Sequence, residues 1–275
     1  MTWWAVDVRP RAADRDRLSA WLVARTGHAV EERDDGTIVS FAADENAAGE
    51  LADEARSQAQ DVIAGVRPLD DVDWSTRWRD GLGPRRFGRL TVAPSWAAPP
   101  AADGPLVVLD PETAFGSGEH GSTRAVLTLL ERHIRPGDRV LDFGSGSGIL
   151  SIAAVLLGAR SAAGIEIDSE SNEVATRNAR INGAADRTEF LDGDAATLGP
   201  LLGPADLLLS NILRNVNVQL LPAIRLSLRP GGMAIFSGME AAEAALFRPD
   251  LSAAGFDVVD ETTDAGWWGV AARLA

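Results

Sequence analysis

From Pro105 to the end of the chain, apolar strand-like segments alternate with segments of helical periodicity. RVLDFG at 139–144 is followed by GILSIAAVLLG at 148–158, and SAAGIEID at 161–168 by SESNEVATRNARING at 169–183. This alternation predicts an α/β fold, with a mostly parallel sheet and helices on both faces. The chain closes with two strand-like segments joined by a short turn, FDVVDE and WWGVAARLA, and such a hairpin predicts one antiparallel strand in that sheet.

The N-terminal part of the chain has a different pattern. WWAVDVR at 3–9 predicts a strand; a helical segment, a hairpin around Asp34-Asp35-Gly36 and a second helix at 45–63 follow. This order is most of a small ferredoxin-like α+β unit, although VRPLDDVD at 66–73 gives no clear fourth strand. We therefore predict two domains, residues 1–66 and 67–275. The second includes a linker segment in which WSTRWRDGLGP at 74–84 predicts a short helix.

Composition excludes several functional classes. Cysteine is absent, which removes disulfides and thiolate chemistry, and the three histidines are too widely spaced for a metal-ligand pattern. The net charge of −14 is unfavourable for nucleic-acid binding, which needs clustered positive charge. Neither a membrane span nor a secretory signal is evident, so we expect a cytoplasmic protein. We expect a monomer, because no long apolar helix face is left over.

A glycine-rich turn follows the strand that ends at Asp142. Gly144, Gly146 and Gly148 stand between this strand and a helix, so a ligand can approach the backbone closely at the helix N-terminus. The GxGxG spacing differs from the GxGxxG of dinucleotide binders. Asp142 is unfavourable beside a phosphate and suits a ligand with positive charge. A merely structural turn is the alternative.

Two further acidic residues end the next strands. Glu166 lies about twenty residues after the glycines, where a carboxylate can accept hydrogen bonds from both ribose hydroxyls. Asp194, in LDGD at 191–194, could accept from an adenine amine or be an ordinary turn aspartate. An adenosine ligand with a cationic centre and no phosphate describes S-adenosylmethionine.

The fourth strand ends in SNIL at 210–213, which places Asn211 at the carboxyl edge of the sheet, where ligands bind in open α/β folds. The amide oxygen of Asn211 could accept hydrogens from an amine and leave its lone pair facing a methyl group. Alternatively, Asn211 caps the following helix.

Four motifs in this order resemble the class I methyltransferases, and in particular the PrmA family, which acts on ribosomal protein L11: AFGSGEHGSTR, DFGSGSGILSIAA, GIEID and SNIL. The resemblance runs from about Asp73 to the end. It implies a seven-stranded sheet with a small substrate-recognition domain before it, and a first glycine-rich segment that forms a second wall over the cofactor. It also implies that the family's cofactor contacts fall on Thr123, Gly144, Glu166 and Asn211.

On this hypothesis Asn211 orients an amine of L11, a lysine side chain or the N-terminal amine, and Phe115 helps to wall the pocket. His120 could relay a proton or make a hydrogen bond within its loop. The sequence departs from the family pattern at Ser117, Glu166 and Arg214. Arg214 is the departure that concerns the substrate, because a cation beside an amine is unfavourable.

Three alternatives remain open from the residues. The enzyme could methylate another protein or a small amine. The chain could be a cofactor-binding module without catalysis, or a nicotinamide-dependent oxidoreductase, although the GxGxG spacing and Asp142 argue against the last.

Overall fold

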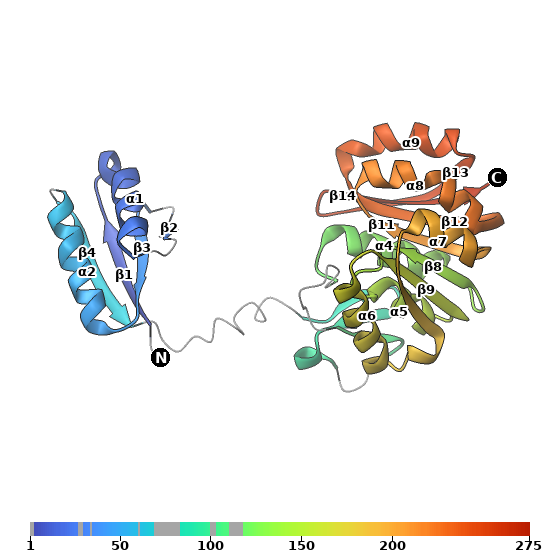
Figure 1. The fold of residues 1–275 in the computed structure, drawn as a ribbon, viewed down its shortest axis with the longest axis horizontal. Coiled ribbons are helices and arrows are strands. Elements are labelled where there is room, and N and C mark those ends of the chain that lie inside the picture. The colour runs from blue at the N-terminus through green and yellow to red at the C-terminus, as the bar shows by residue number, and fades with distance from the viewer. Residues whose placement is uncertain are drawn as a thin grey trace. The chain divides into compact units, whose positions relative to one another are not determined.

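The computed structural model describes residues 3–26, 30–33, 35–59, 61–68, 83–99, 103–109 and 118–275. The chain divides into two compact units, Met1–Asp80 and Gly81–Ala275, which are described separately (Figure 1). The short helix expected at 74–84 falls outside the described residues up to Leu82, and Asp34 of the expected turn, Phe115 and Ser117 also lie outside them.

The first unit has the element order strand, helix, two strands, helix, strand. Its elements are β1 (Trp4–Arg9), a 3-10 turn (Ala12–Asp14), α1 (Arg15–Thr26), β2 (Glu31–Glu32), β3 (Ile38–Ala42), α2 (Glu45–Gln58) and β4 (Ile63–Pro68). The strands form one antiparallel sheet in the order β2-β3-β1-β4. This is the order of elements in a ferredoxin-like unit.

Strand β4 is the fourth strand of the unit, which the pattern at 66–73 does not clearly predict. It pairs with all of β1, from Trp4 opposite Pro68 to Arg9 opposite Ile63. We expected a helix over 45–63, but α2 ends at Gln58 and β4 begins at Ile63. Gly65 and Pro68 weaken its strand propensity, which is tolerated because β4 lies at the edge of the sheet.

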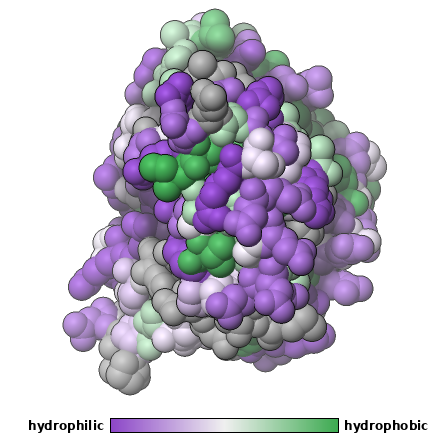
Figure 2. Space-filling view, turned by 90° about the vertical axis from the view of Figure 1, so that its left-hand side faces the viewer, coloured by the Kyte–Doolittle hydropathy of each residue, from purple (hydrophilic) through white to green (hydrophobic). Residues whose placement is uncertain are grey.

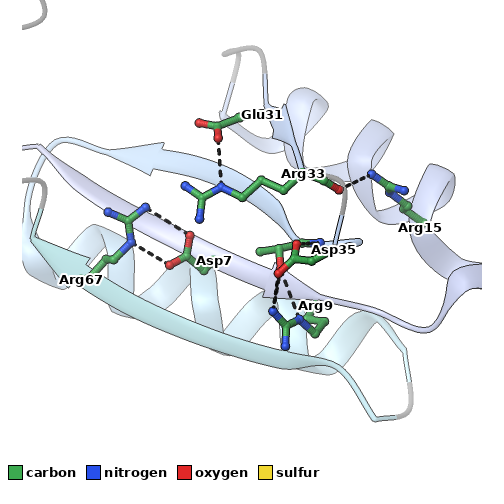
Figure 3. A network of polar contacts seen from close by, with 8 residues as sticks. Asp7, Arg9, Arg15, Glu31, Arg33, Asp35 and Arg67 are labelled. Atoms are coloured by element: carbon green, nitrogen blue, oxygen red, sulfur yellow. Dashed lines mark hydrogen bonds and ion pairs between the residues drawn. The ribbon is translucent and has the colours of Figure 1, made fainter. Parts of the chain in front are cut away.

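The two faces of this sheet differ. Helices α1 and α2 pack on one face, where Val6, Val8 and Ile38 join the helix residues in a small apolar core. Alternate residues of β1 carry charge and pair across the sheet (Figure 3): Asp7 with Arg67 at 2.8 Å and Arg9 with Asp35 at 2.7 Å. These pairs are substantially exposed, so each contributes little to stability.

The second unit contains a seven-stranded sheet in the order β10-β9-β8-β11-β12-β14-β13 (Figure 1). The strands are β8 (Arg139–Phe143), β9 (Ser161–Glu166), β10 (Thr188–Asp192), β11 (Ala205–Asn211), β12 (Leu228–Glu240), β13 (Phe256–Asp264) and β14 (Trp267–Leu274). The pairs from β10 to β12 are parallel, and β14 is antiparallel to both of its neighbours. The α/β fold class and the antiparallel closing hairpin are therefore confirmed.

Helices cover both faces of this sheet. The helices are α4 (Gly121–His133), α5 (Ile149–Leu156), α6 (Ser169–Ile181), α7 (Ala195–Leu202), α8 (Arg214–Ser227) and α9 (Ala244–Ala253). On one face, residues of α4, α5 and α6 form an apolar core with the strand side chains that point to that face. On the other face, residues of α7, α8 and α9 form a second core in the same way. Successive residues of β8 illustrate this division, because Val140 belongs to the first core and Leu141 to the second.

Several elements depart from the sequence-based expectation. Helix α7 was not expected, because its sequence contains Gly199 and Pro200. The segment VNVQLLPAIRLSLRPG at 216–231 predicts a helix throughout, but strand β12 already begins at Leu228. A separate three-stranded sheet precedes α4, formed by β5 (Arg85–Phe87), β6 (Leu90–Ala93) and β7 (Leu106–Val108). Of these strands, the sequence predicts only β6, from RLTVAPSW at 89–96.

Surface character agrees with the acidic composition. The face shown in Figure 2 is mostly hydrophilic, with apolar side chains gathered in small separate patches. Within the described residues, no helix has the length and apolar character needed to cross a membrane.

Candidate functional site

The predicted site residues end three neighbouring parallel strands. Strand β8 lies between β9 and β11, and all three run in the same direction. Their carboxyl ends therefore bring Gly144, Glu166 and Asn211 to one edge of the sheet. This edge is where open α/β sheets bind ligands.

The glycine turn after β8 requires glycine for its shape. Gly144, Gly146 and Gly148 have φ values of 70°, 50° and 77°. Gly148 additionally has no room for a side chain, because a Cβ there would lie 2.8 Å from the ring of Phe190 and 2.9 Å from Ala175. The N–H of Gly144 donates to Ile165 O at 2.9 Å, and that of Gly148 to Ser145 O at 2.8 Å.

Glu166 supports this turn from the neighbouring strand. Its Oε2 accepts from the Gly146 N–H at 3.1 Å, and its Oε1 accepts from the N–H groups of Ile167 and Asp168 at 2.8 and 3.3 Å. A carboxylate offers about four lone-pair sites, so Glu166 keeps capacity for another donor. Gly146, by contrast, has its N–H engaged, and its contribution to a ligand site is the open shape of the backbone.

Asp142 lies directly beneath the turn and is fully buried. Its Oδ2 accepts from the Ser151 hydroxyl at 2.8 Å and the Ser151 N–H at 3.2 Å. Its Oδ1 has no hydrogen-bond partner within the described residues. Burial outweighs the two bonds from Ser151 and raises the pKa of Asp142 to about 7.

Asn211 does not cap the helix that follows it. The N-cap of α8 is Leu213, which makes no side-chain capping bond. Instead, Asn211 Nδ2 donates to Thr123 Oγ1 at 3.2 Å, and Thr123 is fully buried in the first turn of α4. Asn211 Oδ1 is buried and has no partner in the part of the chain that the structure describes. The fourth motif of the resemblance is thus joined to the first by this amide, and the amide oxygen is left as an unpaired acceptor.

The start of α4 is held by the β13–β14 hairpin. A Cβ on Gly121 would lie 2.6 Å from Asp264 O and 2.7 Å from the Trp267 ring, so only glycine fits there. Arg124 pairs with Asp264, and the His120 ring lies 4.3 Å from that of Trp267. His120 Nδ1 also shares a hydrogen bond of 2.8 Å with Ser122 Oγ. His120 therefore contacts both the first turn of α4 and the β13–β14 hairpin.

Other candidate residues have different surroundings. Asp194 is exposed and caps α7, accepting from the Ala196 N–H at 2.9 Å. Arg214 Nε lies 3.2 Å from Glu243 Oε1, so the charge of Arg214 is compensated. Among the described residues, no group of three or more histidine and acidic side chains could hold a metal ion.

Comparison with known proteins identifies the family. The family model described as ribosomal protein L11 methyltransferase (PrmA) matches residues 12–274. The chain belongs to this family. The motif-based expectation of a PrmA methyltransferase is thereby confirmed.

Individual PrmA relatives support the assignment. The ribosomal protein L11 methyltransferases of Pelotomaculum thermopropionicum and Thermus thermophilus are each 40% identical to this chain, covering 76% and 72% of it and 68% and 76% of their own lengths. A crystal structure of ribosomal protein L11 methylase from Lactobacillus delbrueckii superposes with a TM-score of 0.63 at 30% identity. It covers 70% of this chain and 100% of its own.

One buried residue of the site was missed by sequence reasoning. Asn217, in the first turn of α8, is fully buried. Its side chain makes hydrogen bonds to Ser210 and Ile212, the residues on either side of Asn211. A polar residue in a mixed helical segment gives no sequence signal of such a role. Its importance emerges only from its hydrogen-bond partners.

Proposed function

We propose that this chain transfers methyl groups from S-adenosylmethionine to amino groups of ribosomal protein L11, on lysine side chains, the N-terminal amine or both. The observation that carries the proposal is the amide of Asn211. Its nitrogen donates one hydrogen bond to Thr123, and its oxygen is a buried acceptor without a partner in the described chain, at the ligand-binding edge of a PrmA sheet.

The donors and charges of S-adenosylmethionine suit an acceptor-rich site. The cofactor carries an ammonium group, a sulfonium and two ribose hydroxyls, and it supplies the methyl group as an electrophilic carbon on sulfur. Glu166 retains acceptor capacity for the hydroxyls, and the partly exposed Gly144 and Gly146 leave the backbone open to a ligand. We assign six residues to cofactor binding, with Asp194 at the adenine: Thr123, Gly144, Gly146, Glu166, Asp194 and Asn211.

The acceptor nitrogen must be a neutral amine. A lysine with a pKa of about 10.4 is mostly charged at pH 7, and its neutral form costs about 4.6 kcal/mol there. Asn211 Oδ1 accepts an N–H of this neutral amine and directs its lone pair toward the methyl group. Because the amide is uncharged, it aligns the nitrogen without stabilising the unreactive ammonium as a carboxylate would.

The remaining assignments concern the partner. The N-terminal unit binds L11, and the enzyme acts as a cytoplasmic monomer that binds neither membrane nor nucleic acid directly. Pairing of Arg214 with Glu243 supports the amine substrate, because it compensates the one cation that follows the SNIL motif.

The test is transfer of a labelled methyl group from S-adenosylmethionine to purified L11, with peptide mapping of the label. An unrelated lysine-rich protein and a small primary amine serve as comparison acceptors. Label confined to amines of L11 supports the proposal. Equal labelling of the lysine-rich protein would mean that the substrate is a broader class of proteins, and labelling of the small amine alone would reject a protein substrate.

A further inference from the structure

Asn217 is a fully buried amide with all of its polar groups engaged. Its Oδ1 accepts from Ser210 Oγ at 2.6 Å. Its Nδ2 donates to Ile212 O at 2.8 Å and to Ser237 O at 3.1 Å. One side chain therefore links three residues, Ser210 and Ile212 at the end of β11 and Ser237 in β12.

Two of these points flank Asn211 directly. Ser210 precedes Asn211 and Ile212 follows it, while Ser237 is the residue of β12 that pairs with Asn211. Ser237 Oγ in turn donates to Trp268 O in β14 at 2.8 Å. The hydrogen bonds of Asn217 thus connect the turn after β11 to the two strands beyond it.

Close packing supports the same turn. Gly238, with φ of 81°, lies so near Ile212 that a Cβ would be 2.4 Å from Ile212 O. The Ile212 side chain lies against Gly144, 3.1 Å from the place a Cβ would occupy there. Ile212 is therefore fixed on both sides, with its carbonyl bound by Asn217.

Asn211 depends on this support for its direction. Its side chain makes one hydrogen bond, to Thr123, and its oxygen is unpaired among the described residues. One bond at 3.2 Å leaves the placement of the oxygen to the backbone that carries it. An error of about 1 Å in such a group can cost roughly a hundredfold in rate.

We propose that Asn217 is a positioning residue for methyl transfer, which holds the Ser210–Ile212 turn so that Asn211 Oδ1 is aimed at the acceptor amine. This inference rests on the proposed function of Asn211. Asn217 itself touches neither substrate nor cofactor in this account. It acts through the backbone on both sides of Asn211.

The experiment measures kcat for methyl transfer to L11 and the Kd of S-adenosylhomocysteine in the full-length Asn217→Ala variant. We expect kcat to fall roughly 10- to 100-fold while the Kd changes by less than about threefold. The matched control is Asn182→Ala. Asn182 also makes three side-chain hydrogen bonds, two with the Val108 backbone and one to Asn178 O. Asn182→Ala should lower thermal stability similarly and leave kcat within about twofold of the wild-type value.

Ser210→Ala is a milder second variant, because it removes only the bond to Asn217 Oδ1. We expect kcat to fall by roughly three- to tenfold at unchanged cofactor affinity. The proposal is overturned if kcat stays within about twofold of wild type in Asn217→Ala at a temperature where it is folded, or in Ser210→Ala if Asn217→Ala does not fold.

Asn211→Ala distinguishes the proposed role of Asn211 from the positioning role of Asn217. Full activity in Asn211→Ala would reject the proposed role of Asn211 itself. Loss of activity in Asn211→Ala with an unaffected Asn217→Ala would reject only the positioning role.

Discussion

The two turns at the ligand edge of the sheet are stabilised in different ways. The glycine turn after β8 is held by its own backbone N–H groups and by Glu166, one strand away. The turn after β11 is held by one buried side chain, Asn217, and by close packing on Gly238.

The unpaired oxygens beside the two turns also differ. Asp142 Oδ1 belongs to a fully buried carboxyl, and Asn211 Oδ1 to an amide at the edge of the sheet. A carboxyl in that environment changes its charge near pH 7, whereas an amide does not titrate. On the proposed function, the glycine turn provides a shape for the cofactor, whereas the Asn211 turn provides a directed neutral acceptor for the chemistry.

The largest expected effect concerns the carboxyl beneath the glycine turn. Because burial raises the folded-state pKa of Asp142 to about 7, folding binds a proton that the unfolded chain releases near pH 4. Stability from this group is present at acidic pH and is lost as pH rises from about 4 to about 7, by roughly 4 kcal/mol. Urea unfolding of Asp142→Asn should lack this fall, so the stability difference between variant and wild type should change with pH. Parallel pH profiles would contradict the prediction.

Glu166→Gln tests whether the glycine turn serves the cofactor alone. The substitution removes the charge and one of the acceptor oxygens that bind three backbone N–H groups. We expect cofactor affinity to fall roughly 10- to 100-fold, with kcat at saturation within about threefold of wild type. Calorimetry and steady-state rates measure the two quantities. Glu170→Gln, on the exposed first turn of α6, is the matched control. A loss in kcat equal to the loss in affinity would remove the distinction between the turns.

Gly144→Ala probes the contact between the two turns. Both Gly144 and Gly137 have positive φ, so alanine at either position should cost about 1–2 kcal/mol in the free energy of unfolding. Only at Gly144 would the new Cβ lie 3.1 Å from Ile212, whereas that of Gly137 meets open space. Methyl transfer should therefore fall by roughly tenfold in Gly144→Ala and stay unchanged in Gly137→Ala. Equal rates in the two variants would show that Ile212 does not couple the turns.

The smallest effect is expected at Arg214. Arg214→Ala should leave the rate and the KM for L11 within about threefold of wild type, because Glu243 compensates the charge. Glu243→Gln leaves the cation unpaired near the acceptor turn and should raise the KM for L11 more than Arg214→Ala does. A large loss in Arg214→Ala would instead place Arg214 in contact with the substrate.

The two turns also differ in how far the sequence predicts them. The glycine turn is a local feature, because GSGSG requires positive φ values and Glu166 follows at a regular distance, so motif spacing identifies it. The alternating pattern likewise predicted the parallel strands and the closing hairpin. Strand β4 and helix α7 were missed because Gly65, Pro68, Gly199 and Pro200 contradict their local propensities.

The support of the Asn211 turn could not be predicted from the sequence. Asn217 acts on residues five and seven positions earlier and on Ser237 twenty positions later. Gly238 is required by the approach of Ile212, which only the paired strands bring about. Thr123 and Asn211, 88 positions apart, are joined by tertiary structure alone.

The most direct test of the account is the Asn211→Ala variant, measured for kcat with saturating cofactor and L11 and for cofactor Kd by calorimetry. Loss of the unpaired acceptor should lower kcat on the order of 100- to 1,000-fold, with the Kd raised by less than about tenfold. A kcat within about threefold of wild type, with or without weaker cofactor binding, would contradict the claim that the Asn211 amide orients the amine.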